Sequence, residues 1–124
     1  MPAVIGLGLD AVDLDRFRRV LARRPGMLGR VFTAAERADV SGRADPVPGL
    51  AARFAAKEAA MKALGVGLGA IGFADVEVVR GPGGAPVLRA SGRAAELAGA
   101  RGVTAWHVSL THTDTVAVAS VVAR

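Results

Sequence analysis

Four charged residues lie in a stretch of the chain that otherwise reads as a buried helix. From Arg53 to Leu64 there is no Gly, Pro or β-branched residue, and the composition strongly favours a helix. Apolar residues lie nearly all round this expected helix, so we predict that it is buried. It nevertheless carries Arg53, Lys57, Glu58 and Lys62. Lys57 and Lys62 are the only lysines among the sixteen basic residues of the chain.

Two interpretations of these charges remain open at this point. Glu58 and Lys62 are four residues apart in the favourable order for an ion pair, which would stabilise a helix by roughly 0.2–0.5 kcal/mol. Alternatively, a carboxylate and an ammonium group are held at the edge of a cleft, where they could bind a metal ion and a phosphate.

A second carboxylate follows a short apolar stretch near the start of the chain. Residues 4–9 are predicted to form a buried strand, and their glycines allow another backbone to approach closely. Asp10 is expected to end this strand, a position where α/β proteins often bind ligands. Residues 6–11 also match a dinucleotide-binding pattern. However, no acidic residue follows about twenty positions later and the chain is too short for repeated βαβ units, so we expect no dinucleotide site.

The composition bounds the class of protein. The 124 residues, of which 52% are apolar and 22% charged, predict one globular domain spanning 1–124. The lack of cysteine excludes disulfides and thiolate metal sites and fits a cytoplasmic protein. Neither a signal-peptide pattern nor a membrane-length apolar run is present, so no membrane partner is expected. The net charge of +5 indicates a polyanionic partner, which could be a nucleic acid, a phosphorylated ligand or an acidic protein.

The remaining patterns predict an α+β domain, with helices and short antiparallel strands around the central helix. Thr33 and Glu36 form a capping-box pattern that opens a short helix. The other expected elements are a helix from residue 14 to 21, a loop over 41–49, strands at 76–79, 87–90, 106–111 and 116–122, a helix over 93–100, and a turn at 112–115.

Three arginines share one face of the first predicted helix. Arg16, Arg19 and Arg23 follow at i, i+3 and i+7, opposite an apolar face that includes Phe17. This face could be simply solvated, or it could receive an acidic partner. The two histidines of the chain lack the spacing of zinc ligands.

Several blocks follow one another in an order and spacing that cover almost the whole chain. They are residues 5–10, Arg16, Phe32-Thr33 with Glu36, residues 53–59 with Lys62, and residues 108–113. Together they resemble the holo-[acyl-carrier-protein] synthases, the small carrier-protein-synthase type of 4′-phosphopantetheinyl transferases. This resemblance implies an antiparallel sheet packed on a long central helix.

The resemblance also implies a reaction and a catalytic site. Members of this family transfer the phosphopantetheine arm of coenzyme A to a serine of an apo-acyl carrier protein, releasing adenosine 3′,5′-bisphosphate. Asp10 and Glu58 match the family's Mg²⁺ ligands, a donor set that suits this ion. Lys62 matches the residue that faces the pyrophosphate, where it can offset developing negative charge. Glu58 and Lys62 are thereby the implied catalytic residues.

Binding residues and assembly follow from the same resemblance. It places Arg53, Lys62, Gly65, His112 and Thr113 around coenzyme A. It also places Arg16 on a basic helix that meets an acidic carrier protein, and we add Arg19 and Arg23 by helical spacing alone. Because the family forms trimers with active sites between subunits, we expect a homotrimer built on the strands near 106–110 and 116–122.

Some alternatives stay open. The general base could be Glu58, a metal-bound water or an acidic neighbour, and either His112 or the adjacent Asp114 could be the more important polar group. The native carrier could be of the fatty-acid or the polyketide type. A basic nucleic-acid-binding module would explain the charge, but with 4% aromatic residues it would have few stacking platforms. A purely structural domain would leave the grouping of Asp10, Glu58 and Lys62 unexplained.

Overall fold

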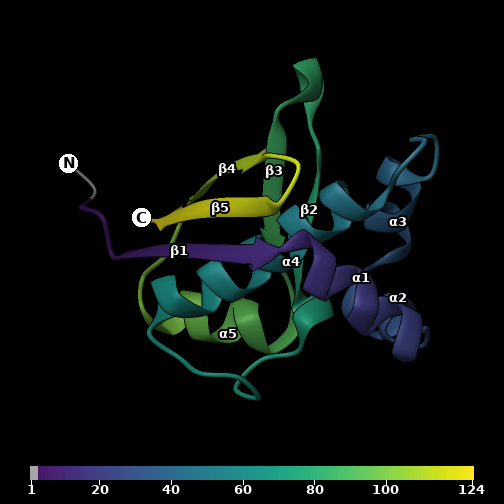
Figure 1. The fold of residues 1–124 in the computed structure, drawn as a ribbon. Coiled ribbons are helices and arrows are strands. Elements are labelled where there is room, and N and C mark those ends of the chain that lie inside the picture. Colours follow the sequence, from purple (N-terminus) through teal and green to yellow (C-terminus); the bar gives the residue numbers. More distant parts are fainter. Residues whose placement is uncertain (1–2) are drawn as a thin grey trace.

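The computed structural model describes residues 3–124 and has the α+β fold predicted from the sequence (Figure 1). Strands β1, β5 and β4 form an antiparallel sheet in that order, and β2 and β3 form a separate hairpin. The elements are β1 (Gly6–Asp13), α1 (Leu14–Arg23), α2 (Met27–Val31), α3 (Ala34–Val40), α4 (Val47–Leu64), η1 (Phe73–Asp75), β2 (Val76–Arg80), η2 (Pro82–Gly84), β3 (Pro86–Ala90), α5 (Gly92–Ala100), β4 (Trp106–His112) and β5 (Val116–Ala123). Within the described part of the chain, no helix is long and apolar enough to cross a membrane.

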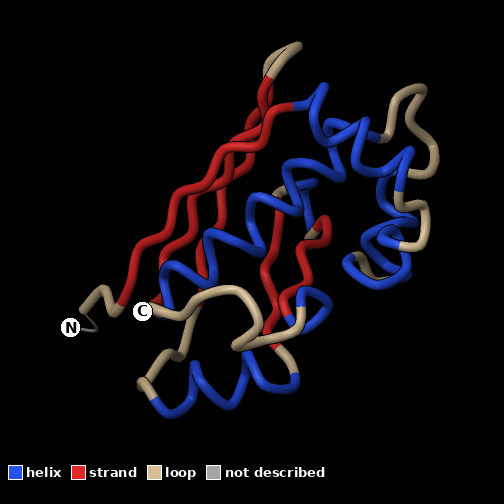
Figure 2. The backbone as a smooth tube through the Cα atoms, turned by 60° about the horizontal axis from the view of Figure 1, so that its bottom comes forward, coloured by secondary structure: helices blue, strands red, loops and turns tan. Residues whose placement is uncertain are grey.

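Helix α4 is the centre of the fold and is buried on almost all sides, as predicted. Thirteen of its eighteen residues are buried, and most of them are alanines. One side packs against the three-stranded sheet and the hairpin, and the other packs against α1, α2 and α3. Figure 2 shows α4 running along one face of the sheet. The small alanine side chains allow elements on every side to lie close to the helix axis.

Two glycines let β1 lie directly on the backbone of α4. A Cβ atom added at Gly6 would lie 1.7 Å from the carbonyl oxygen of Ala63, and one added at Gly8 would lie 1.7 Å from that of Ala59. No side chain can occupy such a position, so only glycine fits here. This confirms the close backbone approach predicted from the sequence.

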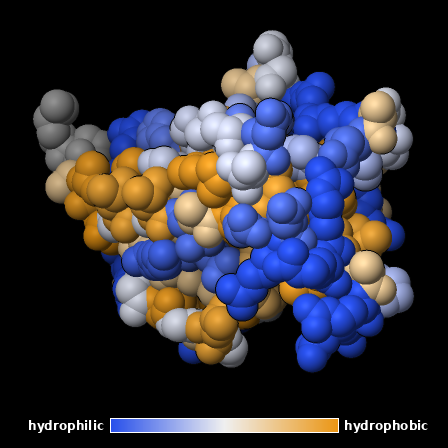
Figure 3. All heavy atoms as spheres, in the orientation of Figure 1, coloured by the Kyte–Doolittle hydropathy of each residue, from blue (hydrophilic) through white to orange (hydrophobic). Residues whose placement is uncertain are grey.

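The opposite face of the sheet is exposed, and it is apolar along β1 and most of β5. The prediction that residues 4–9 form a buried strand is therefore wrong for the side chains on this face. Leu7 and Leu9 point away from α4 and keep more than 60% of their surface accessible. The strand register sets them beside Val122 and Ser120 of β5. Figure 3 shows the apolar side chains gathered over this side of the molecule. We call this surface the outer sheet face; its residues are Leu7, Leu9 and Ala11 of β1, Val118, Ser120 and Val122 of β5, and His107, Ser109 and Thr111 of β4.

A fully buried ion pair joins α3 to α4. Lys57 Nζ donates a hydrogen bond to Glu36 Oε1 at 2.7 Å and also donates to two backbone carbonyl oxygens. Glu36 accepts further hydrogen bonds from the backbone N–H groups of Val78 and of Thr33, its partner in the predicted capping box. Burial lowers the pKa of Lys57, and the Glu36 carboxylate opposes this effect. Because every polar atom of this pair is satisfied, its burial is tolerated, and Lys57 has a structural role.

The first strand extends further than the sequence predicts. The expectation that Asp10 ends the strand is wrong, because β1 continues to Asp13. Its partner β5 pairs with it over the whole length, with Asp10 opposite Ala119 and Asp13 opposite Val116. Aspartate is a poor strand former, so this extension depends on pairing with a distant segment and has no local signal.

Other boundaries also differ from the predictions, and one helix was missed. Helix α4 begins at Val47, inside the predicted loop, and Pro48 lies in its first turn where a proline has no helical hydrogen bond to lose. Strand β4 includes His112, which the sequence placed in the turn. The short helix α2 was not predicted at all, since five residues are too few to show a clear periodicity.

Candidate active site

Asp10, Glu58 and Lys62 come together where β1 lies on α4. Asp10 is on the face of β1 that carries the two glycines, because side chains alternate along a strand. Lys62 Nζ donates a hydrogen bond to Asp10 Oδ1 at 3.2 Å and another to the carbonyl oxygen of Leu9 at 2.9 Å. The ion pair of Lys62 is therefore with Asp10, on another element, and not with Glu58 one turn earlier on the same helix.

The environment of Glu58 disfavours its ionised form. Its half-buried position, the charge of Asp10 and a hydrogen bond with Asp10 together raise the pKa of Glu58 to about 7, while Lys62 acts in the opposite direction. Two carboxylates at such short range resist carrying two negative charges together. A cation placed between them would favour the doubly ionised pair.

The carboxylate pair is a suitable donor set for Mg²⁺. Mg²⁺ is commonly held by one or two carboxylates and takes its other ligands from water and substrate phosphate. Asp10 and Glu58 supply hard oxygen ligands from two separate elements, and Asp10 faces inward. Within residues 3–124, no group of three or more His, Cys, Asp or Glu side chains could hold a metal ion. Two carboxylates alone would fit Mg²⁺ only if water and substrate oxygens complete its coordination.

A cleft of about 500 Å³ opens beside Glu58, between α1 and α4. We call it the α1 cleft; it is lined by Ala11, Val12, Asp13, Arg16, Phe17, Val20, Met27, Phe54 and Glu58. Its walls are mainly apolar, and Arg16 supplies its positive charge. Arg19 and Arg23 are exposed on the same helix but do not line the cleft. The predicted basic face of α1 is therefore exposed, and of its three arginines only Arg16 borders the carboxylate site.

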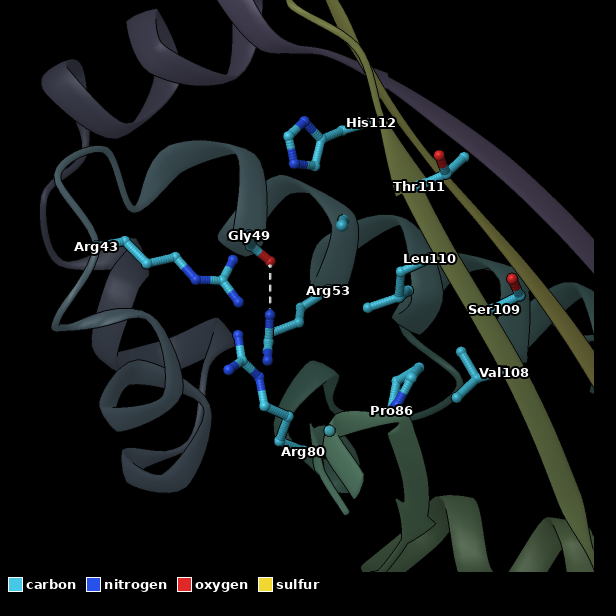
Figure 4. Close-up of a pocket in the computed structure, with 12 residues that line it drawn as sticks. Arg43, Gly49, Arg53, Arg80, Pro86, Val108, Ser109, Leu110, Thr111 and His112 are labelled. Carbon is cyan, nitrogen blue, oxygen red and sulfur yellow. Dashed lines mark hydrogen bonds between the residues drawn. The ribbon is translucent and has the colours of Figure 1, made fainter. Parts of the chain in front are cut away.

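A second cleft, of about 340 Å³, is strongly basic. We call it the arginine cleft; it is lined by Arg43, Gly49, Ala52, Arg53, Arg80, Gly84, Pro86 and residues 108–112. Figure 4 shows the guanidinium groups of Arg43, Arg53 and Arg80 pointing toward one another, with the His112 ring at the edge of the cleft. The structure therefore brings the predicted residues Arg53 and His112 into one site.

Arg53 is fixed in this cleft by hydrogen bonds, and Arg43 lies in an excess of positive charge. Arg53 is buried and donates hydrogen bonds to the carbonyl oxygens of Val78 and Gly49 and to Asp39 Oδ2, at 3.0 to 3.3 Å. Burial lowers the pKa of Arg43, and the charges of Arg80 and Arg53 lower it further. Such an excess of positive charge in a recess favours binding of an anion.

Sequence reasoning missed Arg43 and Arg80. Arg43 lies in the loop before α4 and Arg80 is the last residue of β2, so neither belongs to a motif or to a periodic face. Fourteen arginines are scattered along the chain, which hides the few that converge. Only the packing of the hairpin against α4 identifies them.

The carboxylate site and the arginine cleft lie on different sides of α4. Arg53 and Glu58 are five residues apart, which corresponds to roughly 140° around a helix. The two clefts have no lining residue in common. Within this chain, the two sets of residues therefore do not meet at a single point.

The other predicted coenzyme A residues lie at turns. Gly65 ends α4 in a left-handed conformation with φ 71°, and the Arg101 side chain packs beside it. Thr113 follows His112, and its hydroxyl group accepts hydrogen bonds from the backbone N–H groups of Thr115 and Val116. Thr113 thus shapes the turn between β4 and β5.

Comparisons with known proteins identify the family. Residues 6–121 match the family model described as the 4′-phosphopantetheinyl transferase superfamily. The chain is 54% identical over 122 residues to a holo-[acyl-carrier-protein] synthase of Frankia casuarinae, covering 98% of both chains. It is 47% identical over 121 residues to a holo-[acyl-carrier-protein] synthase of Salinispora arenicola, again covering 98% of each.

Solved structures agree with this relationship. The Neisseria meningitidis holo-[acyl-carrier-protein] synthase superposes with a TM-score of 0.88 at 30% identity, covering 98% of this chain and 99% of that one. The Helicobacter pylori enzyme, solved in complex with coenzyme A, gives 0.83 at 28% identity and covers 95% and 99%. The chain belongs to the 4′-phosphopantetheinyl transferase superfamily. Within that superfamily it is an enzyme of the holo-[acyl-carrier-protein] synthase type, which confirms the family resemblance found in the sequence.

Proposed function

We propose that this protein transfers the 4′-phosphopantetheine group of coenzyme A to a serine hydroxyl of an acidic apo-acyl carrier protein, releases adenosine 3′,5′-bisphosphate and depends on Mg²⁺. The observation that carries the proposal is the convergence of Asp10, Glu58 and Lys62 from two elements. A pair of carboxylates for a metal ion and an ammonium group for a pyrophosphate are what phosphoryl transfer requires.

Each residue of the site has a separate task. Asp10 and Glu58 would hold a Mg²⁺ ion, which when bound would polarise the pyrophosphate and offset its charge. Lys62 lies one turn beyond Glu58, so its flexible side chain can turn to the pyrophosphate and offset charge on the leaving group. The serine proton leaves to Glu58, to a bound water or to an acidic neighbour, and the choice among these stays open.

The simplest test of this function follows the mass of a carrier protein. Incubation with coenzyme A, Mg²⁺ and an apo-acyl carrier protein is expected to add one phosphopantetheine group to the carrier. The same mixture with EDTA, or with a carrier whose acceptor serine is replaced by alanine, should leave the mass unchanged. An unmodified carrier in the complete mixture, for both fatty-acid and polyketide types, would contradict the proposal.

The α1 cleft is the proposed docking site of the carrier protein. Arg16 is exposed at its rim and Glu58 lies in its wall, so a helix bound here would present its serine beside the carboxylate pair. Phe17 and Phe54 offer apolar contact within the same cleft. Arg19 and Arg23 extend the positive charge along α1. Acidic residues on the carrier would be steered to this surface at low ionic strength.

Reversing the charge of Arg16 should change the KM for one substrate and not for the other. Arg16→Glu is expected to raise the KM for carrier protein about tenfold or more, because it places a negative charge against an acidic partner. The KM for coenzyme A should hardly change. Steady-state kinetics at two salt concentrations measures both effects, and Arg23→Glu, further from the metal site, serves as a matched control with a smaller effect. If Arg16→Glu instead weakened coenzyme A binding and left the KM for carrier protein unchanged, the docking site would have to lie elsewhere.

The arginine cleft is the proposed binding site for a coenzyme A phosphate. Arg43, Arg53 and Arg80 supply positive charge, and Asp39 accepts hydrogen bonds from the Arg53 side chain and from the Arg80 backbone N–H. His112 can donate a further hydrogen bond from the opposite wall. Because this cleft and the carboxylate site lie on different sides of α4, we expect coenzyme A to contact the two sets of residues on two different subunits.

The outer sheet face supports the proposal of a homotrimer. Leu7, Leu9 and Val122 form an apolar surface that a neighbouring subunit could cover. This assigns β1 to the interface in addition to the two strands expected from the sequence. Trimer formation and a cytoplasmic location both stay predictions.

Complementation between inactive variants tests the shared active site. Glu58→Gln and His112→Ala are each expected to lose most activity alone. Co-expressed as mixed trimers they should regain a substantial part of it, because some interfaces then combine an intact Glu58 with an intact His112. Light scattering should give a trimer mass for each preparation. Absence of rescue in confirmed mixed trimers would place both residues in the same protomer's site, and a monomer mass with full activity would exclude the trimer.

A further inference from the structure

The position of Lys62 in the carboxylate site has a consequence for metal binding. More than half of this side chain is exposed, whereas Asp10 has only 15% of its side chain exposed. Lys62 nevertheless lies back over β1, with Nζ held by Asp10 Oδ1 and by the carbonyl oxygen of Leu9. A flexible ammonium group that could extend into water instead neutralises the inward-facing carboxylate.

We infer that Lys62 is the resting counterion of Asp10, and that its ammonium group competes with the divalent cation for this carboxylate until coenzyme A phosphates draw it away. This inference rests on the proposed function and adds a coupling to it: the free enzyme binds the metal ion weakly, and coenzyme A strengthens that binding by removing Lys62 from Asp10.

The electrostatics support such competition. An ammonium group and a divalent cation that contact the same carboxylate lie within about 5 Å and repel each other strongly even in the dielectric of water. The four-carbon stem of Lys62 allows the group to move, and a pyrophosphate offers it a more highly charged partner than a single carboxylate. By linkage, a ligand that removes Lys62 from Asp10 must raise the metal affinity.

Metal binding in the absence of coenzyme A tests the inference without using activity. Free Mn²⁺ is measured by electron paramagnetic resonance during titration into the wild-type protein, Lys62→Met and Lys62→Gln. Both variants keep a long side chain without the charge, and each is expected to bind Mn²⁺ about tenfold more tightly than the wild type. Arg37→Met, which removes one charge from an exposed residue of α3, should leave the Mn²⁺ affinity close to that of the wild type.

A second titration measures the coupling. Coenzyme A is expected to raise the Mn²⁺ affinity of both proteins, because its phosphates can ligate the metal ion, but to raise that of the wild type by a clearly larger factor than that of Lys62→Met, after correction for Mn²⁺ bound by free coenzyme A. If the folded Lys62 variants bound Mn²⁺ no more tightly than the wild type, the inference would be overturned, while the proposed metal site would still stand. If no protein bound Mn²⁺ in either titration, or if Asp10→Asn did not weaken the binding, the metal site itself would be wrong and the inference would fall with it.

Discussion

Replacing Glu58 by glutamine is expected to lower kcat/KM by about a thousandfold or more, and Asp10→Asn should have an effect of similar size. Each change removes one of the two charged oxygen ligands of the proposed Mg²⁺ site while preserving the shape of the side chain. Transfer of phosphopantetheine to a carrier protein, followed by mass spectrometry, measures the loss.

Stability distinguishes this effect from simple unfolding. Burial and the neighbouring Asp10 raise the pKa of Glu58, so its ionised form is disfavoured in the folded protein. A neutral glutamine at this position should therefore leave the melting temperature at pH 8 unchanged or slightly higher. Glu96→Gln makes the same chemical change at an exposed carboxylate on α5 and should keep full activity. Full activity of Glu58→Gln at ordinary Mg²⁺ concentration would show that the metal ion is held elsewhere.

Gly8→Ala is expected to destabilise the protein by more than about 3 kcal/mol, which is a large part of the stability of a small domain. The added methyl group would lie 1.7 Å from the carbonyl oxygen of Ala59, and neither backbone can move without separating β1 from α4. Any displacement of β1 also carries Asp10 away from Glu58. We therefore expect loss of transfer activity even where the variant still folds.

A matched glycine provides the control for this experiment. An added Cβ at Gly29 in α2 would meet nothing within 4 Å, and its φ is not in the left-handed region. Gly29→Ala should therefore leave stability unchanged or raise it by up to about 1 kcal/mol. Chemical denaturation of both variants measures the difference. Similar stabilities for Gly8→Ala and Gly29→Ala would mean that β1 does not lie on α4 as described.

The sequence by itself determined those elements that depend on residues close together in the chain. The helix around Arg53–Leu64 follows from its strong helix formers, and the capping box at Thr33 and Glu36 follows from a fixed spacing. The Gly-Pro-rich turn between β2 and β3 follows from residues that break regular structure. The types and spacing of Glu58 and Lys62 left two interpretations open, an ion pair along the helix or a site for a metal ion and a phosphate. These features depend on neighbours within one or two helical turns.

Tertiary structure alone decided where the charged side chains lie. Lys57 and Lys62 are both lysines of α4, yet one is fully buried against Glu36 and the other reaches Asp10 across β1. Nothing within the helix distinguishes them, because their partners lie 21 and 52 residues away along the chain. The extension of β1 past Asp10 likewise depends on pairing with β5.

The arginine cleft shows the same limit most clearly. Arg43, Arg53 and Arg80 come from a loop, a helix and a strand end, and no spacing in the sequence links them. They converge because the β2–β3 hairpin packs against α4, where Arg53 donates a hydrogen bond to the carbonyl oxygen of Val78 in β2. Sequence by itself therefore determined the helix, the turns and the type of chemistry. Only the packing of distant segments decided which charges share a site, because their interactions act across space and leave no periodic pattern in the chain.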